Sequence, residues 1–139
     1  MPGGETLPLK GLTTADVIKA GRDAVDRALE ALDKIERYDD DHIPVPWEIC
    51  KRPKLDPEVW SDSDVKAVEI KDLCASQRLL TIERVRYYIE HPGGIEHGRR
   101  AFANVYAMDD RMIIVDGHHR LAAFWLLGAE LANVWFLEE

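Results

Sequence analysis

The sequence predicts an α+β protein, because patterns typical of strands and of helices both recur along its 139 residues. Apolar and polar residues alternate over residues 65–70, which predicts a half-buried strand. Two further apolar runs, 102–108 and 111–115, flank Asp109-Asp110 and predict a β-hairpin. Helical spacing of apolar residues over 14–37 predicts an N-terminal amphipathic helix. We therefore expect a small sheet with packed helices.

The predicted N-terminal helix has Thr14 as its N-cap and Asp16 in its first turn. One narrow apolar stripe runs along it, formed by Ile18, Val25, Leu29 and Leu32. Because the chain has no long heptad repeat, we expect this stripe to pack within the chain, against one face of the sheet, in preference to a second copy. We assign residues 1–64 to this helix and the proline-rich extension after it, and 65–139 to the core of one compact unit.

A second helix is predicted over residues 79–89, with Ile82, Val85 and Ile89 on one face. The polar segment 95–100 follows it, and we expect this segment to form a mobile lid. Arg99 and Arg100 would be the phosphate contacts of the lid.

The composition limits the classes of partner. A net charge of −8 argues against tight non-specific binding to nucleic acid, because that affinity comes from Lys and Arg contacts to phosphates. DNA would have to meet a local basic patch, for which the candidates are Arg84, Arg86, Arg99, Arg100 and Arg120. No apolar run approaches the roughly 18 residues of a membrane span, and the first residues lack a signal-peptide pattern. We expect a cytoplasmic monomer or homodimer that does not contact membranes.

The two cysteines, Cys50 and Cys74, lie far apart in the sequence and lack the spacing of a zinc site. The cytoplasmic profile favours two buried free thiols over a disulfide.

Chemistry-bearing residues concentrate where a predicted strand, turn and helix meet. Residues 113–115 read as a buried strand, Asp116-Gly117 as a tight turn, and the apolar stretch up to Gly128 as a helix. The start of a helix leaves backbone N–H groups without partners and carries the positive end of the helix dipole. Gly117 lets the backbone approach a ligand closely. The junction predicts a phosphate or nucleotide site, and the alternative is that Asp116 merely caps a solvated first turn.

Three kinds of side chain at this junction suit phosphate chemistry. Asp116 is the candidate ligand for Mg²⁺ arriving with ATP or another nucleotide. His118 and His119 are candidate hydrogen-bond donors to phosphate. They are also candidate catalytic acids or bases near neutral pH, and Asp116 is a third catalytic candidate. Arg120 would bind phosphate oxygens and stabilise a transferred phosphoryl group. Adjacent histidines on a helix point about 100° apart, which disfavours a dedicated zinc site.

The run Asp116-Gly117-His118-His119-Arg120-Leu121-Ala122-Ala123, with Leu127-Gly128 after it, resembles the signature of the ParB/sulfiredoxin superfamily. It is most similar to small ParB-like proteins of bacteriophages and mobile elements, and the similarity runs from about Val68 onward. The resemblance implies a small mixed sheet with packed helices, a nucleotide bound at the Asp116–Arg120 turn, and Gln77 facing that turn. A bacteriophage origin would place the protein in the host cytoplasm.

The chain also departs from two known members of this superfamily. Sulfiredoxins have a catalytic cysteine where His118 stands, so reduction of sulfinic acids is not expected. Free-serine kinases use a glutamate in an earlier loop, where this chain has Ala75-Ser76-Gln77 and no carboxylate. The leading expectation is therefore a nucleotide- or phosphate-binding protein that hydrolyses a nucleotide or transfers a phosphoryl group.

Two alternatives to this function stay open. One is a ParB-like DNA-binding or nuclease-type module. The other is a non-catalytic phage protein that engages a protein partner through the N-terminal helix.

A final apolar run, 133–137, predicts a closing strand, so that strand 113–115, the helix and this strand form a β-α-β unit. This would place the site at the carboxyl end of a strand, where α/β proteins commonly bind ligands.

Overall fold

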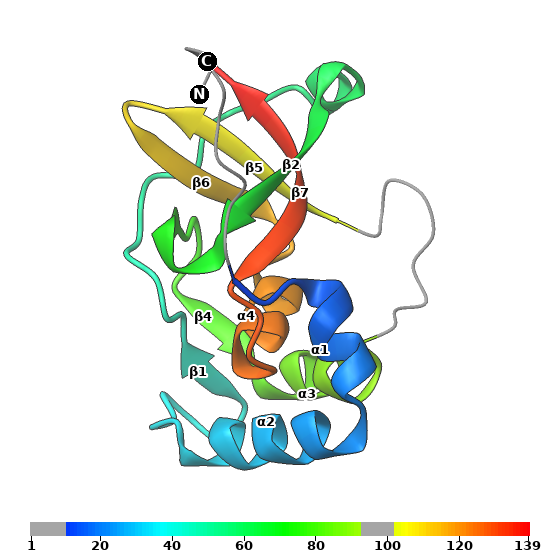
Figure 1. Cartoon of the computed structure of the whole chain (residues 1–139). Coiled ribbons are helices and arrows are strands. Elements are labelled where there is room, and N and C mark those ends of the chain that lie inside the picture. The colour runs from blue at the N-terminus through cyan, green and yellow to red at the C-terminus, as the bar shows by residue number, and fades with distance from the viewer. Residues whose placement is uncertain (1–10, 93–101) are drawn as a thin grey trace.

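The fold is a mixed five-stranded sheet with the α-helices gathered at one end (Figure 1). The computed structural model describes residues 11–92 and 102–139. The strand order across the sheet is β2 (Asp64–Glu69), β7 (Leu131–Glu138), β5 (Ala103–Met108), β6 (Arg111–Asp116) and β3 (Leu73–Cys74). The pairs β5·β7 and β3·β6 are parallel, and the pairs β2·β7 and β5·β6 are antiparallel. The predicted α+β class is confirmed.

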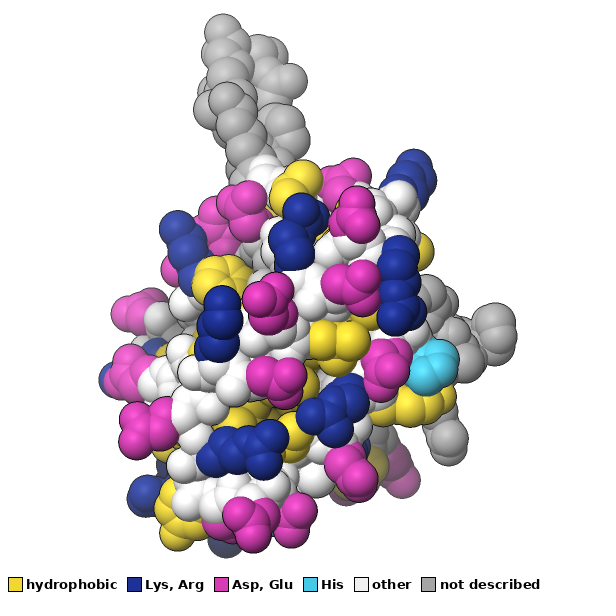
Figure 2. All heavy atoms as spheres, turned by 90° about the horizontal axis from the view of Figure 1, so that it is seen from below, with side chains coloured by type: hydrophobic (Ala, Val, Ile, Leu, Met, Phe, Trp, Pro, Cys, Tyr) yellow, Lys and Arg dark blue, Asp and Glu magenta, His cyan; other side chains and the backbone are white. Residues whose placement is uncertain are grey.

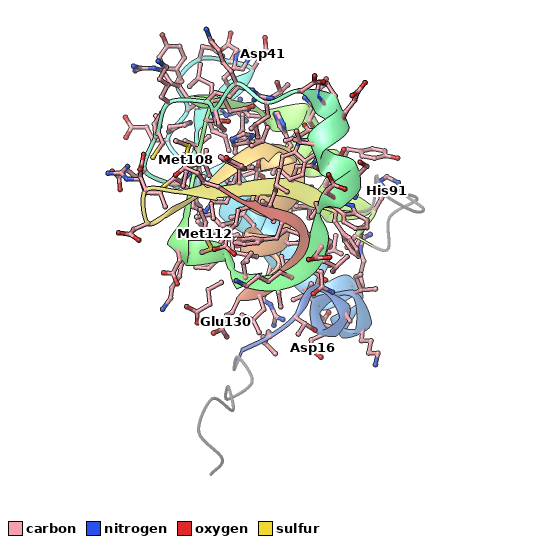
Figure 3. The ribbon with its side chains drawn as sticks, turned by 90° about the horizontal axis from the view of Figure 1, so that it is seen from above. Asp16, Asp41, His91, Met108, Met112 and Glu130 are labelled. Carbon is pink, nitrogen blue, oxygen red and sulfur yellow. The ribbon has the colours of Figure 1, made fainter. Side chains whose placement is uncertain are left out.

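The hairpin predicted around Asp109-Asp110 is confirmed as β5 and β6. Asp109 and Asp110 have φ angles of 52° and 60°, so the turn has the left-handed backbone that matches the twist of the two strands. Met108 pairs with Arg111 at its closed end. Met108 and Met112 on this hairpin lie on the opposite side of the molecule from His91 (Figure 3).

The strand predicted over 65–70 is present as β2, but most of it is not half-buried. Its first four residues are exposed, Val65 among them, and Val68 is its one fully buried side chain. The reason is its position, because β2 is an edge strand of the sheet. Alternation alone did not reveal that position.

Two helices stand where the sequence predicted one over 14–37. They are α1 (Thr14–Ala20) and α2 (Arg22–Lys34), and Gly21 separates them with φ 74° and ψ −148°. Only glycine adopts this backbone readily, so the helix breaks there. The N-cap is Thr13 and not Thr14. Its hydroxyl accepts from the Asp16 N–H at 3.2 Å, and the Asp16 carboxylate accepts from the Thr13 N–H at 2.8 Å.

This cap gives a first prediction that separates the two threonines. Thr13→Ala should lower the free energy of unfolding by about 1 kcal/mol, because it leaves a helix N–H without its acceptor. Thr14→Ala, inside α1, should leave it within about 0.5 kcal/mol of the native value. Urea unfolding of both variants measures the difference, and equal effects would contradict the assigned cap.

The apolar stripe of the N-terminal region packs within the chain, as expected, but against helices and not against a face of the sheet. α2 lies on α3 (Ile82–Glu90) and α4 (His118–Leu126). Its buried residues are Ala24, Val25, Ala28 and Leu32, whereas Ile18 of α1 is exposed. Leu29 packs at the border of this core. Polar substitutions at Leu29 and Leu32 would therefore destabilise the fold, so they could not test whether the N-terminal helix binds a protein partner.

The region before residue 65 is joined to the core by further contacts. β1 (His42–Pro44) pairs antiparallel with β4 (Leu79–Thr81) in a small second sheet. The buried Trp47 donates through Nε1 to the Ile70 carbonyl at 2.9 Å. Two 3₁₀ helices, Pro57–Asp62 and Ile70–Asp72, flank β2. None of the described helices is long and apolar enough to cross a membrane.

Candidate functional site

The predicted strand, turn and helix are confirmed as β6, Gly117 and α4. Gly117 takes the left-handed conformation with φ 97° and ψ 20°. A Cβ built on it would lie 2.5 Å from the Cβ of Ala103 and 2.8 Å from its Cα. Residue 117 must therefore be glycine for two reasons, its backbone conformation and its close packing on the start of β5.

Asp116 does not cap α4. Its Oδ1 accepts from the N–H of Gly117 at 3.0 Å, and within residues 11–92 and 102–139 no side-chain cap is found at the Gly117 position. The first-turn N–H groups of α4, from His118 to Arg120, have no carbonyl partner within the helix and lie at the positive end of its dipole. The junction therefore combines the start of a helix with an exposed carboxylate at Asp116.

His118 lies almost completely inside the protein, at 2% exposure. Its Nε2 accepts a hydrogen bond from the N–H of Ser76 at 3.0 Å, and its ring meets Trp47 edge-on. The Ser76 hydroxyl in turn donates to the Ile114 carbonyl at 2.6 Å. Burial, together with the smaller effects of the charges of Arg52 and His119, lowers the pKa of His118 to about 4.

His119 is held in the same way on the other side of the helix start. It is 7% exposed, and its Nε2 accepts from the N–H of Thr81, the residue before α3, at 3.0 Å. Burial and the nearby Arg84 lower its pKa to about 4, while Asp116 acts in the opposite direction. Since each Nε2 accepts a hydrogen bond, each neutral ring carries its proton on Nδ1.

These contacts change the role expected for the two imidazoles. The sequence predicted side chains that donate to phosphate or titrate near neutral pH. The structure shows neutral rings whose Nε2 atoms hold the backbone at Ser76 and Thr81. The physical reason is burial, which disfavours the charged imidazolium. Their backbone N–H groups stay at the start of α4, so His118 and His119 still contribute main-chain donors.

Cationic side chains surround the junction. The Arg120 guanidinium lies over the ring of Tyr88 on α3, with 4.9 Å from Cζ to the ring centroid. Arg84 acts electrostatically on His119, and Arg52 acts on His118. Arg84 and Arg120 were candidates from the sequence.

Sequence reasoning assigned no role at this site to Arg52, Ser76 or Tyr88, although Ser76 lies in the loop that was compared with the free-serine kinases. Ser76 follows β3, which runs parallel to β6, so the carboxyl ends of both strands meet beside α4. β3 is only two residues long, which is too short for a sequence pattern to reveal it.

Three other candidates have different outcomes. The Gln77 side-chain amide donates to the Leu79 carbonyl at 2.8 Å, so it braces its own loop. Arg99, Arg100 and the predicted lid lie outside the described residues.

The predicted β-α-β unit is wrong in direction. β6 is antiparallel to β5 and β7 is parallel to it, so α4 joins two antiparallel strands. The site still lies at the carboxyl end of β6.

The charges on the face around α2 are mixed. On the face formed around α2, acidic and basic side chains are interspersed (Figure 2). Within residues 11–92 and 102–139, no three His, Cys, Asp or Glu side chains form a group suited to a metal ion. A metal at Asp116 would therefore have to share its coordination with a ligand.

Comparisons of the chain with protein-family models, curated proteins and solved structures found no significant match. What the fold and the site define is an α+β protein with a strand, a left-handed glycine and a helix start at one junction.

Proposed function

We propose that the protein binds the phosphate groups of a nucleotide at the start of α4, as a ParB/sulfiredoxin-like protein. The observation that carries this proposal is Gly117. Its left-handed backbone packs directly on Ala103 and opens a nine-residue helix, at whose N-cap the described part of the chain places no side-chain cap. Such a helix start suits the oxygen atoms of a phosphate. The resemblance of residues 116–123 to the superfamily signature supports the same assignment.

The residues of the junction would have different roles in binding the nucleotide. The N–H groups of His118, His119 and Arg120 donate to phosphate oxygens, and the Arg120 guanidinium adds a charge-assisted contact. The two buried imidazoles are positioning residues, because they fix α4 to the loops at Ser76 and Thr81. Asp116 keeps a carboxylate oxygen that is free of the Gly117 contact and suits Mg²⁺ bound with the nucleotide. Hydrolysis or transfer of a phosphoryl group would then involve Asp116 and Arg120.

Calorimetry with ATP, ADP and CTP, each with and without Mg²⁺, tests this proposal. The native protein should bind at least one nucleotide, and Arg120→Gln should weaken that binding by about tenfold, the effect of losing one charge-assisted contact. Arg22→Gln is the matched control, since it removes the same charge from an exposed position on α2 and should leave the affinity unchanged.

Two results would contradict the proposal. One is the absence of binding heat with every nucleotide, in the presence and absence of Mg²⁺. The other is equal affinity of Arg120→Gln and the native protein. Binding to a short DNA duplex that falls steeply with salt, without nucleotide binding, would identify the DNA-binding alternative instead.

A further inference from the structure

The two cysteines meet at a place that the candidate site does not use. Residues 49 and 75 form an isolated parallel bridge, in which Cys50 N–H donates to the Ala75 carbonyl and Ala75 N–H donates to the Glu48 carbonyl, both at 2.7 Å. Cys50 directly follows one bridged residue and Cys74 directly precedes the other, and the Cys50 side chain lies near enough to act on the Cys74 thiol. Both are free thiols, as the sequence indicated, but Cys74 alone is buried and Cys50 is partly exposed.

The Cys50 sulfur has an unusual set of neighbours. Arg111 donates through Nη1 to Cys50 Sγ at 2.8 Å, and the same nitrogen contacts Glu48 Oε1 at 3.0 Å. A guanidinium stabilises negative charge on a sulfur that it contacts. Burial, and then the interaction with Cys50, raises the pKa of Cys74 to about 11, so Cys74 stays protonated at neutral pH. The Arg111 contact therefore marks Cys50 as the attacking sulfur of the pair, and Cys74 is the thiol next to it.

We infer that Cys50 and Cys74 form a peroxide-responsive pair that closes reversibly into a disulfide. The Cys50 thiolate attacks one oxygen of hydrogen peroxide, so that an S–O bond forms, the O–O bond breaks and hydroxide leaves. The Cys74 sulfur then attacks the Cys50 sulfenic acid. The S–S bond forms, the S–O bond breaks, and the departing hydroxyl leaves as water with the Cys74 proton.

The surrounding chain allows this closure. Residues 51–56, directly after Cys50, have no regular secondary structure, so the backbone there can adjust to the narrow geometry of a disulfide. Cys74 is held in β3 beside β6 and stays in place. Cys50 is the more exposed of the two cysteines, so a peroxide reaches it first.

Intact-mass measurement of the full chain after peroxide treatment tests the inference. The native protein should lose two hydrogens, dithiothreitol should restore them, and peptide mapping should join Cys50 to Cys74. Cys74→Ser should stop at a Cys50 sulfenic acid that dimedone traps. Cys50→Ser should form neither product.

The contribution of Arg111 has its own test. Arg111→Gln should react with peroxide roughly tenfold more slowly, because a thiolate loses its neighbouring cation. Arg22→Gln, the same change on α2, should react at the native rate. Thiols that stay unmodified while free cysteine in the same sample is oxidised would overturn the inference. So would a disulfide that forms only between two chains, or an Arg111→Gln variant that reacts at the native rate.

Discussion

Gly117→Ala is expected to lower the free energy of unfolding by about 2–5 kcal/mol. Two costs add at this position. An alanine in the left-handed region loses about 1–2 kcal/mol, and its methyl group would overlap both the Cβ and the backbone Cα of Ala103. Because one of the overlapping atoms belongs to the backbone of β5, a change of rotamer gives no relief. Chemical denaturation of the variant measures the loss.

Gly128→Ala is the matched control for this experiment. Gly128 also has a positive φ, 102°, but nothing lies within 4 Å of a Cβ built there. Its substitution should therefore cost about 1–2 kcal/mol, the conformational part alone. If both variants lose the same amount, the close approach of Gly117 to Ala103 is wrong, and with it the geometry on which the proposed phosphate site depends.

The second large effect is a loss of stability at acidic pH. The free energy of unfolding should fall steadily as the pH is lowered from about 6.5 to about 4, because His118 and His119 have folded-state pKa values near 4 against an ordinary value of 6.5. Above this window both states hold neutral imidazoles and the stabilisation is complete. Within this pH window the two imidazoles bind protons in the unfolded chain but stay neutral in the folded chain. The loss is about 2–3 kcal/mol for each imidazole across the window.

Substitution of one imidazole isolates its share of this acid effect. His118→Gln keeps an acceptor for the Ser76 N–H but removes the titrating group, so the slope of stability against pH should fall by about half. His119→Gln should do the same at Thr81. Urea unfolding at a series of pH values provides the slopes. A native protein whose stability does not change over this window would refute the buried, neutral state of both rings.

The parts of the fold that the sequence predicted are those encoded by local patterns. Asp109-Asp110 between two apolar runs marked the hairpin, and Asp116-Gly117 between a strand and an apolar helix marked the junction. Gly21 shows a limit of such patterns. A glycine inside a helical period is compatible with one continuous helix, and only its actual φ of 74° shows that the helix divides.

The candidate site was less predictable, because its character depends on contacts between distant segments. His118 and His119 were correctly found at the junction. Their hydrogen bonds lead to Ser76 and Thr81, which lie 42 and 38 positions earlier in the sequence. A sequence pattern cannot show that an imidazole on a helix start is buried under another loop. The meeting of Cys50 with Cys74 depends equally on the bridge between residues 49 and 75.

Backbone amide NMR tests the central claim most directly. Addition of the nucleotide that binds most tightly in calorimetry, with Mg²⁺, should shift the ¹⁵N–¹H resonances of His118, His119 and Arg120 most strongly, since these N–H groups are proposed to hold the phosphates. Residues of α2 should change little. Saturating shifts centred on any other part of the protein, or no shift at the start of α4, would contradict the account.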